Sequence, residues 1–279
     1  MTELDGSAPT EVPLTGGNTT AVVRVGETVR RSTGHWTPAV HGVLHYLERA
    51  GFDGSPRVLG RDGRGREVLT YLPGQAACGA PWPSGFWSDS TLIQVGELLR
   101  RYHEAVRSYR PGAESRWWYT DRAPGTDEII CHNDAAPYNT VLDGDRVVGF
   151  IDWDIAGPAV PRWDLAFAAW SWVPLHHPAL ARQLGGPGAR SQARRLALLC
   201  SAYGDAEPVE ALLPLIRDRV AASRDGIRDG VVEGNPIMIK LRDQGHLDDI
   251  EMTLAYLGSR IPRLTSTMRQ QVAPGAVRT

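Results

Sequence analysis

The sequence is nearly without lysine and has little cysteine. Lys240 is the only lysine in 279 residues, so nearly all of the basic side chains are arginine. The cysteines Cys78, Cys131 and Cys200 are odd in number and widely spaced. This spacing argues against a disulfide framework, and we expect a reducing, cytoplasmic environment.

A large excess of charge and long hydrophobic runs are also missing. The net charge of -2 gives no general attraction to nucleic acid or to an anionic membrane. The most apolar stretch, residues 165–175, is too short to span a bilayer. Residues 1–5 carry acids where a secretory signal carries basic residues. We therefore expect a monomer or weak dimer whose partners include neither nucleic acid nor membrane.

The composition is that of a globular protein, with 42% hydrophobic and 22% charged residues. Short segments rich in β-branched residues lie near the N-terminus and predict an antiparallel sheet. These segments are residues 20–25, 28–31, 56–60 and 66–72. Between them, Thr37-Pro38 has the form of a helix start and Gly51 that of a helix end.

A stretch rich in glycine and proline, residues 73–85, precedes a mainly helical region. Within that region, Asp143-Gly144 predicts a tight hairpin between two short strands. We predict an α+β fold of two lobes. The smaller lobe is a sheet with one helix at residues 1–75, where 1–12 form a loose leader, and the larger helical lobe spans 76–279.

The segment from His132 to Asp152 has the spacing of a phosphoryl-transfer site. Asn139 follows Asp134 by five residues, and Asp152 lies at the end of the predicted hairpin. Such a site needs a carboxylate near the acceptor hydroxyl and oxygen ligands for magnesium. Turn loops are rich in Asp and Asn for backbone reasons, so the spacing alone is weak. The strand before it and the hairpin after it give the signal its strength.

Residues 131–139, 149–154 and 162–166 together resemble the aminoglycoside phosphotransferase family of small-molecule kinases. The resemblance implies a protein-kinase-like fold, with a nucleotide-binding N-terminal lobe and a C-terminal lobe that carries the catalytic loop. It also implies ATP or GTP with Mg2+ and transfer of the γ-phosphoryl group to a hydroxyl. The roles it implies are catalytic base for Asp134, metal ligands for Asn139 and Asp152, and loop support for His132 and Asp164.

The chain departs from this family pattern at three places. Asn133 stands where the family commonly has glycine, and we expect activity to survive this. Asp154 shares a strand face with Asp152, so either carboxylate could contact the metal, but the spacing from Asn139 favours Asp152. The third departure is the missing lysine on the third strand.

Arg30 or Arg31 is our candidate to replace that lysine, since a guanidinium can bind phosphate oxygens. Strand alternation directs one of the two inward, and the sequence leaves open which one. Both could also be solvated charges on an edge strand. Glu48 is the only acid on the following helix, and it comes late for an ion pair with this arginine.

The remaining nucleotide contacts are predicted less directly. Gly16 and Gly17 could form a turn that covers the phosphates, although an ordinary hairpin explains two adjacent glycines equally well. The family architecture places the nucleotide base near Thr70, Tyr71 and Leu72.

Members of the family usually bind cationic amino-sugars in an acidic cleft, so acids in the C-terminal helices are candidate substrate residues. The candidate substrate residues are Asp225, Asp229, Glu233, Asp248, Asp249 and Trp172. An ordinary solvated face, with arginines interleaved, explains these acids equally well. Burial in the core explains Trp172 better than stacking on a sugar. We therefore expect a small cationic substrate of the aminoglycoside type. The alternatives are a basic peptide antibiotic, a choline, homoserine or sugar substrate, or a non-catalytic nucleotide-binding scaffold.

Overall fold

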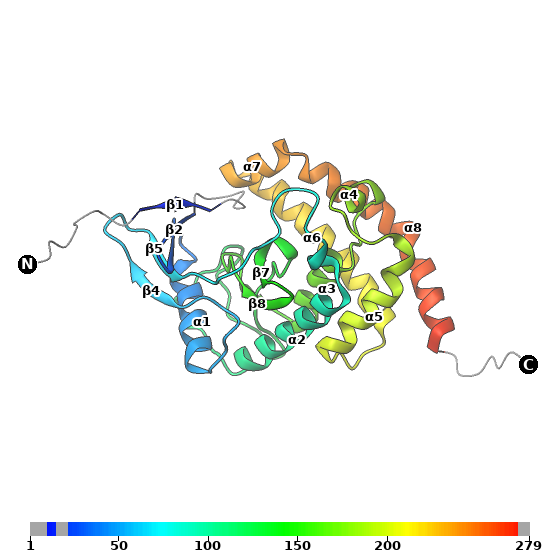
Figure 1. The fold of residues 1–279 in the computed structure, drawn as a ribbon, viewed down its shortest axis with the longest axis horizontal. Coiled ribbons are helices and arrows are strands. Elements are labelled where there is room, and N and C mark those ends of the chain that lie inside the picture. The colour runs from blue at the N-terminus through cyan, green and yellow to red at the C-terminus, as the bar shows by residue number, and fades with distance from the viewer. Residues whose placement is uncertain (1–9, 15–21, 273–279) are drawn as a thin grey trace, which may run out of the picture.

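The computed structural model describes residues 10–14 and 22–272, so Gly16 and Gly17 lie outside the described residues. A small sheet and its helix form one end of the molecule, and the helical remainder forms the other (Figure 1). The sheet is antiparallel with strand order β1-β2-β3-β5-β4. Its strands are β1 (Val12–Pro13), β2 (Val23–Val25), β3 (Thr28–Arg31), β4 (Val58–Arg61) and β5 (Glu67–Thr70).

Helix α1 (Thr37–Arg49) lies between β3 and β4 in the chain and packs its apolar face into the core. Pro38 occupies the start of this helix, where its missing N–H costs no hydrogen bond. Val43 and Leu47, four residues apart, are fully buried. Gly51 has a φ of 74°, which ends the helix, and the Phe52 N–H then donates to the Leu47 carbonyl at 2.9 Å.

The larger region is mainly helical and carries two short strand pairs. Its helices are α2 (Asp89–Val106), α3 (Pro161–Trp172), α4 (Pro178–Gln183), α5 (Gln192–Tyr203), α6 (Leu212–Val232), α7 (Pro236–Asp243) and α8 (His246–Val272). Its strands are β6 (Ile129–Cys131), β7 (Thr140–Asp143), β8 (Arg146–Phe150) and β9 (Gly157–Ala159). Short 3-10 helices are η1 (Ser84–Trp87), η2 (Pro137–Asn139), η3 (Ala189–Ser191) and η4 (Val209–Ala211).

The hairpin β7–β8 connects the two regions. The backbone of Gln75, which follows the sheet, exchanges two hydrogen bonds with Leu142 on β7, at 2.8 and 2.9 Å. On β8, the Phe150 N–H donates to the Gly54 carbonyl at 2.9 Å. A Cβ at Gly149 would lie 2.7 Å from that same carbonyl oxygen, so glycine permits this close approach. The β7–β8 hairpin is therefore fixed to the end of the sheet region.

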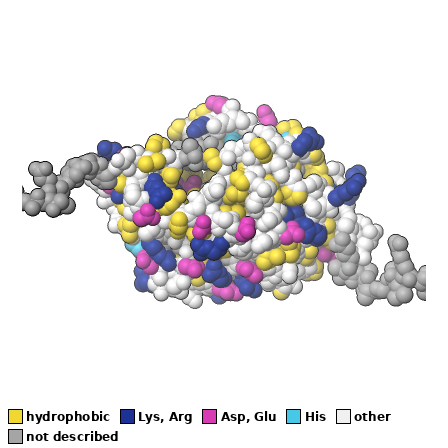
Figure 2. Space-filling model, viewed as in Figure 1, with side chains coloured by type: hydrophobic (Ala, Val, Ile, Leu, Met, Phe, Trp, Pro, Cys, Tyr) yellow, Lys and Arg dark blue, Asp and Glu magenta, His cyan; other side chains and the backbone are white. Residues whose placement is uncertain are grey.

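These features confirm the predicted fold class, a small antiparallel sheet joined to a larger helical portion. The predicted hairpin is also confirmed, since Gly144 takes a φ of 59° in the turn between β7 and β8. Within residues 10–14 and 22–272, we find no helix with the length and apolar character needed to cross a bilayer. Acidic and basic side chains are interspersed over the face drawn in Figure 2.

Candidate active site

Asp134 lies in the loop between β6 and η2, and both of its carboxylate oxygens accept hydrogen bonds. The Asn139 amide donates from Nδ2 to Oδ2 at 2.8 Å, and the Tyr138 hydroxyl donates to Oδ1 at 2.8 Å. Burial raises the pKa of Asp134 to about 7, although the hydrogen bond from Tyr138 and the charge of Arg219 act in the opposite direction. The structure thus brings together two of the residues that the sequence singled out.

His132 fixes the shape of this loop from a fully buried position. Its Nδ1 accepts the Asp134 backbone N–H at 3.2 Å, so Nε2 carries the proton and donates to the Ile151 carbonyl at 3.1 Å. Burial lowers the pKa of His132, which favours this neutral form. The Ile151 N–H in turn donates to the Asn139 carbonyl at 2.9 Å. These bonds hold the end of the hairpin, where Asp152 follows, beside the Asp134 loop.

Asn133, which stands where the resembled family commonly has glycine, adopts a backbone conformation typical of glycine. Its φ is 65°, in the left-handed region that glycine adopts freely and that asparagine tolerates better than most residues. Its side-chain Nδ2 donates to the carbonyls of Ile155 and Gly157 at 3.1 and 3.4 Å. The substitution therefore preserves the backbone turn and adds contacts to the segment that begins β9.

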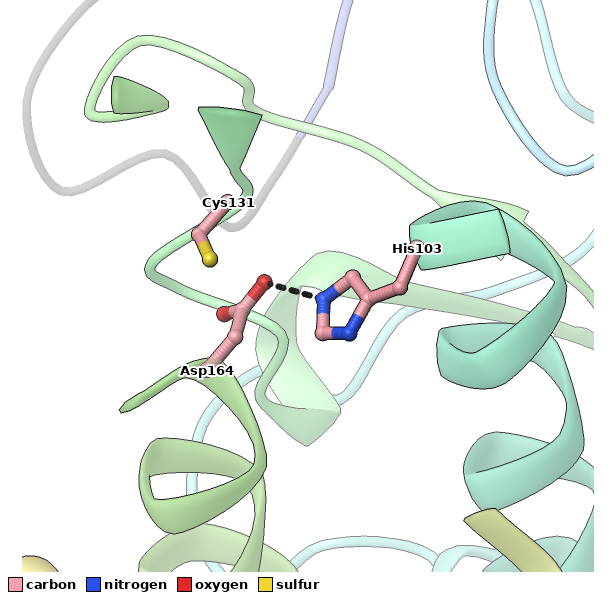
Figure 3. Close-up of side chains that lie close together, drawn as sticks. All are labelled: His103, Cys131 and Asp164. Atoms are coloured by element: carbon pink, nitrogen blue, oxygen red, sulfur yellow. Dashed lines mark hydrogen bonds and ion pairs between the residues drawn. The ribbon is translucent and has the colours of Figure 1, made fainter. Parts of the chain in front are cut away.

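Asp164 on α3 supports the loop from within the core, where it is fully buried. Its two oxygens accept the backbone N–H groups of His132 and Asn133 at 2.8 and 2.9 Å. His103 Nε2 on α2 also contacts Asp164, at 3.1 Å (Figure 3). Burial alone would raise the pKa of Asp164, but the hydrogen bonds and charges of the surrounding groups outweigh it and lower that pKa.

Figure 3 shows Cys131 beside this pair, and the three residues have side chains of metal-ligand type. The carboxylate oxygens of Asp164 are already used by two backbone amides and by His103. Cys131 Sγ lies 3.5 and 3.6 Å from the carbonyl oxygens of Ala159 and Val160. We conclude that the cluster braces the loop instead of binding an ion.

Replacing Asp164 with alanine should lower the free energy of unfolding by about 3 kcal/mol, because it leaves buried donors without their charged acceptor. Urea denaturation of the wild type and the variant would measure this. Asp121→Ala is the matched control, since the Asp121 side chain is 63% exposed and its ion pair with Arg116 is 3.4 Å long. That control should change stability by less than about 0.5 kcal/mol. Equal losses in both variants would rule out the bracing role.

Arg31 is the arginine that points into the site. Its guanidinium lies among three carboxylates and its side chain is only 9% exposed. Nη1 is 2.9 Å from Asp152 Oδ1, Nη2 contacts Asp154, and Nε is 2.7 Å from Glu67 Oε1. Burial alone would lower the pKa of Arg31, but the charges of the three acids outweigh it and raise that pKa.

Arg30 points to the other face of the sheet, where its Nε is 3.9 Å from Asp62. The acid that pairs with Arg31 in the sheet region is Glu67 on the neighbouring strand β5. Glu67 also accepts a contact from His41 on α1, at 2.7 Å. Glu48 is exposed. The acid that pairs with Arg31 therefore lies on a strand of the sheet and not on the following helix.

The residues present fit a divalent cation. Three carboxylates face one guanidinium at Arg31, which leaves an excess of negative charge. Among the described residues, Asn139 uses only the Nδ2 end of its side chain for hydrogen bonds, so its amide oxygen is the available ligand. Asp152, with a φ of 58°, keeps its side chain 38% exposed. Hard oxygen ligands of this kind suit Mg2+.

The other predicted nucleotide contacts lie where the sheet ends. Thr70 pairs with Thr28 at the end of β5, and the Tyr71 N–H donates to the Glu27 carbonyl at 2.9 Å. Tyr71 and Leu72 are half-buried, and the Arg24 guanidinium lies 3.9 Å from the centre of the Tyr71 ring. Their backbone is thus at the junction of the two regions.

The predicted substrate residues differ from one another in burial and in pairing. Trp172 is fully buried, and its indole N–H donates to the Ala135 carbonyl beneath the Asp134 loop, so its assignment as a substrate residue is wrong. Asp225 pairs with Arg224 at 2.8 Å, and Asp249 pairs with His177 at 3.0 Å. The other three predicted acids are exposed. They are Asp229, Glu233 and Asp248.

Arg219 on α6 is a site residue that sequence reasoning missed. It is 8% exposed, and its Nη2 donates to the Asn133 carbonyl at 2.8 Å. Its guanidinium also lies 4.6 Å from the centre of the Phe167 ring. Its charge lowers the pKa of Asp134, although burial outweighs it there. Because Asn133 is 86 positions away, only the tertiary fold could have identified this contact.

The chain resembles known proteins in sequence. A model of the phosphotransferase enzyme family matches residues 113–198, which include the whole Asp134 loop. The trifolitoxin immunity protein of Rhizobium leguminosarum bv. trifolii is 35% identical over 198 residues. That match covers 70% of this chain and 74% of the relative.

Two solved structures are similar in fold. The amicoumacin kinase hAmiN, in complex with AMP-PNP and Ca2+, gives a TM-score of 0.61 at 12% identity, over 91% of this chain and 88% of that one. A choline/ethanolamine kinase family protein from Mesorhizobium loti gives 0.55 at 19% identity, over 97% and 90%. At such low identity, these likenesses establish a shared fold.

Proposed function

This chain belongs to the phosphotransferase enzyme family, and from this premise we propose that it transfers the γ-phosphoryl group of ATP or GTP to a hydroxyl of a small cationic antibiotic. It is a small-molecule kinase. The observation that carries the proposal is the contact of Asp134 with Asn139, with Asp152 held beside them by His132 and Ile151. We also propose that residues 1–75 form the nucleotide-binding lobe and residues 76–279 the lobe with the substrate site.

In the proposed reaction, Asp134 orients the acceptor hydroxyl and receives its proton. A carboxylate whose pKa is raised to about 7 is suited to both tasks near neutral pH. Asn139 and Asp152 would hold Mg2+, with Asp154 as a further carboxylate. When bound, the ion would neutralise charge on the phosphates. His132, Asn133 and Asp164 would keep the loop rigid, which preserves the alignment of the reacting groups.

Arg31 would take the part that the strand-three lysine plays in protein kinases. Its guanidinium is planar and can bind two phosphate oxygens at once. Glu67 orients it from the sheet side at 2.7 Å. Thr70, Tyr71 and Leu72 would contact the nucleotide base through their backbone, and Gly16 and Gly17 would cover the phosphates.

The acceptor would approach along α6. Asp229 is three residues from Gly226, so the two lie on one face of this helix, and Glu233 directly follows its last residue, Val232. A Cβ at Gly226 would lie 3.6 Å from the Tyr119 ring, and the Tyr119 side chain is 58% exposed. We propose that Asp229 and Glu233 attract the cationic groups of an aminoglycoside-type acceptor. Asp225, Asp248 and Asp249 would add to the negative field at longer range.

A second candidate acceptor is a basic peptide antibiotic. The observation that favours it is the name of the 35% identical relative, a trifolitoxin immunity protein. A toxin with a hydroxyl group would be inactivated by the same transfer chemistry. The catalytic residues would keep their roles, and only the contacts along α6 would differ.

Expression in a susceptible bacterium tests the proposal. We expect the wild type to raise the inhibitory concentration of at least one aminoglycoside or basic peptide antibiotic, and Asp134→Asn to leave it at the level of the empty vector. A thermal-shift assay with MgATP and MgGTP tests nucleotide binding separately. Equal resistance from both forms would contradict catalysis and favour a scaffold or sequestering role.

A further inference from the structure

Tyr138 is a feature of the loop that the phosphoryl-transfer spacing does not require. The residue is 41% exposed, yet its hydroxyl donates to Asp134 Oδ1 at 2.8 Å. The Tyr138 hydroxyl is the donor of this hydrogen bond, since the Asp134 carboxylate can only accept. An exposed ring thus places a polar group directly on the proposed base.

This hydroxyl lies where an acceptor hydroxyl must bind. A general base has to lie about 2.6–3.2 Å from the oxygen whose proton it takes. Asp134 Oδ2 is held by the Asn139 amide at 2.8 Å, so Oδ1 is the oxygen for the acceptor. An acceptor hydroxyl that bonds to Oδ1 would lie next to the Tyr138 hydroxyl, which already contacts that oxygen.

The ring of Tyr138 lies beside the ring of Trp82. Its centre lies 6.4 Å from that of Trp82, in an edge-on arrangement, and Trp82 stacks on Trp87 at 5.2 Å. Both tryptophans are tied to the Leu184 carbonyl, through the Trp82 backbone N–H at 3.0 Å and the Trp87 indole N–H at 3.2 Å. Trp82 is therefore held in place beside Tyr138, whose ring is 41% exposed.

We propose that Tyr138 is a gating residue: in the substrate-free enzyme its hydroxyl takes the acceptor's place on Asp134, and it turns aside when the acceptor binds, so that its ring packs against the acceptor. This inference rests on the proposed role of Asp134. The gate limits a wasteful reaction, in which water is the acceptor. There the water oxygen bonds to the γ-phosphorus, the bond to the β-phosphate oxygen breaks, and the water proton passes to Asp134.

Two variants measure the contributions of the Tyr138 hydroxyl and of its ring separately. Tyr138→Phe should raise nucleotide hydrolysis without acceptor, and lower the acceptor KM, each by about three- to tenfold, because one hydrogen bond no longer has to be broken. Its kcat for transfer should stay within about twofold of the wild type. Tyr138→Ala should raise hydrolysis as well, but should increase the acceptor KM by about three- to tenfold, since the ring contact is lost.

Steady-state kinetics with MgATP or MgGTP would measure both reactions, with Tyr46→Phe as the control on a half-buried tyrosine of α1. Unchanged hydrolysis and unchanged acceptor KM in both Tyr138 variants would overturn the gate while leaving the proposed function intact. If the wild type binds nucleotide but shows no transfer and no hydrolysis that depends on Asp134, the proposed function fails and the gate fails with it.

Discussion

Asp134→Asn should reduce kcat for phosphoryl transfer by about 1,000-fold, within the range that general bases contribute. The substitution keeps the size of the side chain and its contact with Asn139, but removes the ability to accept a proton. The KM for the nucleotide should change little, because Asp134 faces the acceptor in our proposal. Initial rates with saturating nucleotide and acceptor would measure the effect.

Asp143→Asn is the matched control for this variant, because Asp143 lies on the neighbouring β7–β8 hairpin with a 61% exposed side chain. Its rate should stay within about twofold of the wild type, as expected for a surface residue. A free energy of unfolding equal to that of the wild type would show that Asp134→Asn is folded. Retention of near-full activity by a folded Asp134→Asn would exclude Asp134 as the base.

Arg31→Ala should lower kcat/KM for the nucleotide by about 100- to 1,000-fold, the loss expected for one preorganised charged donor at a transition state. The variant also leaves Glu67, Asp152 and Asp154 without the guanidinium that they share. Arg31→Lys should recover most of the loss, to within about tenfold of the wild type, since lysine is the usual residue of protein kinases at this position.

Arg30→Ala is the control for Arg31→Ala, because the two arginines are adjacent and point to opposite faces of β3. Its kcat/KM should remain within about threefold of the wild type, as expected for a residue outside the site. Equal losses from Arg30→Ala and Arg31→Ala would mean that the effect comes from a damaged strand. An unchanged kcat/KM for the nucleotide in Arg31→Ala would show that Arg31 does not bind the phosphates.

The fold class was predictable because its signals are local. The segments rich in β-branched residues, the helix start at Thr37-Pro38 and the Asp143-Gly144 turn each depend on neighbours in the chain. The mainly helical region was also predicted, but not α7 or the full length of α8, which continues through Pro262 to Val272. Proline usually disrupts a helix interior. Here Leu264 and Met268 are buried beyond it, so tertiary packing outweighs that local preference.

The candidate site was predictable only in part, because some of its residues are close in the sequence and others meet only in the folded chain. Asp134, Asn139 and Asp152 lie within one continuous segment, so their spacing carries the information. The partner of Arg31 is Glu67, which lies directly opposite it in the register of β3 and β5. That register, like the contact of Arg219 with Asn133, depends on how distant segments pack. The core position considered for Trp172 is confirmed, but its hydrogen bond to Ala135 under the loop could not be read from local sequence.

The central claim is that this chain phosphorylates a cationic antibiotic with Asp134 as the base. The most direct test incubates the protein with MgATP or MgGTP and a panel of aminoglycosides and basic peptide antibiotics, and measures product masses. We predict that the wild type adds one phosphoryl group to at least one antibiotic, while Asp134→Asn adds none in the same time. The claim would be contradicted if the folded, nucleotide-binding wild type gave no phosphorylated product, or if Asp134→Asn gave as much product as the wild type.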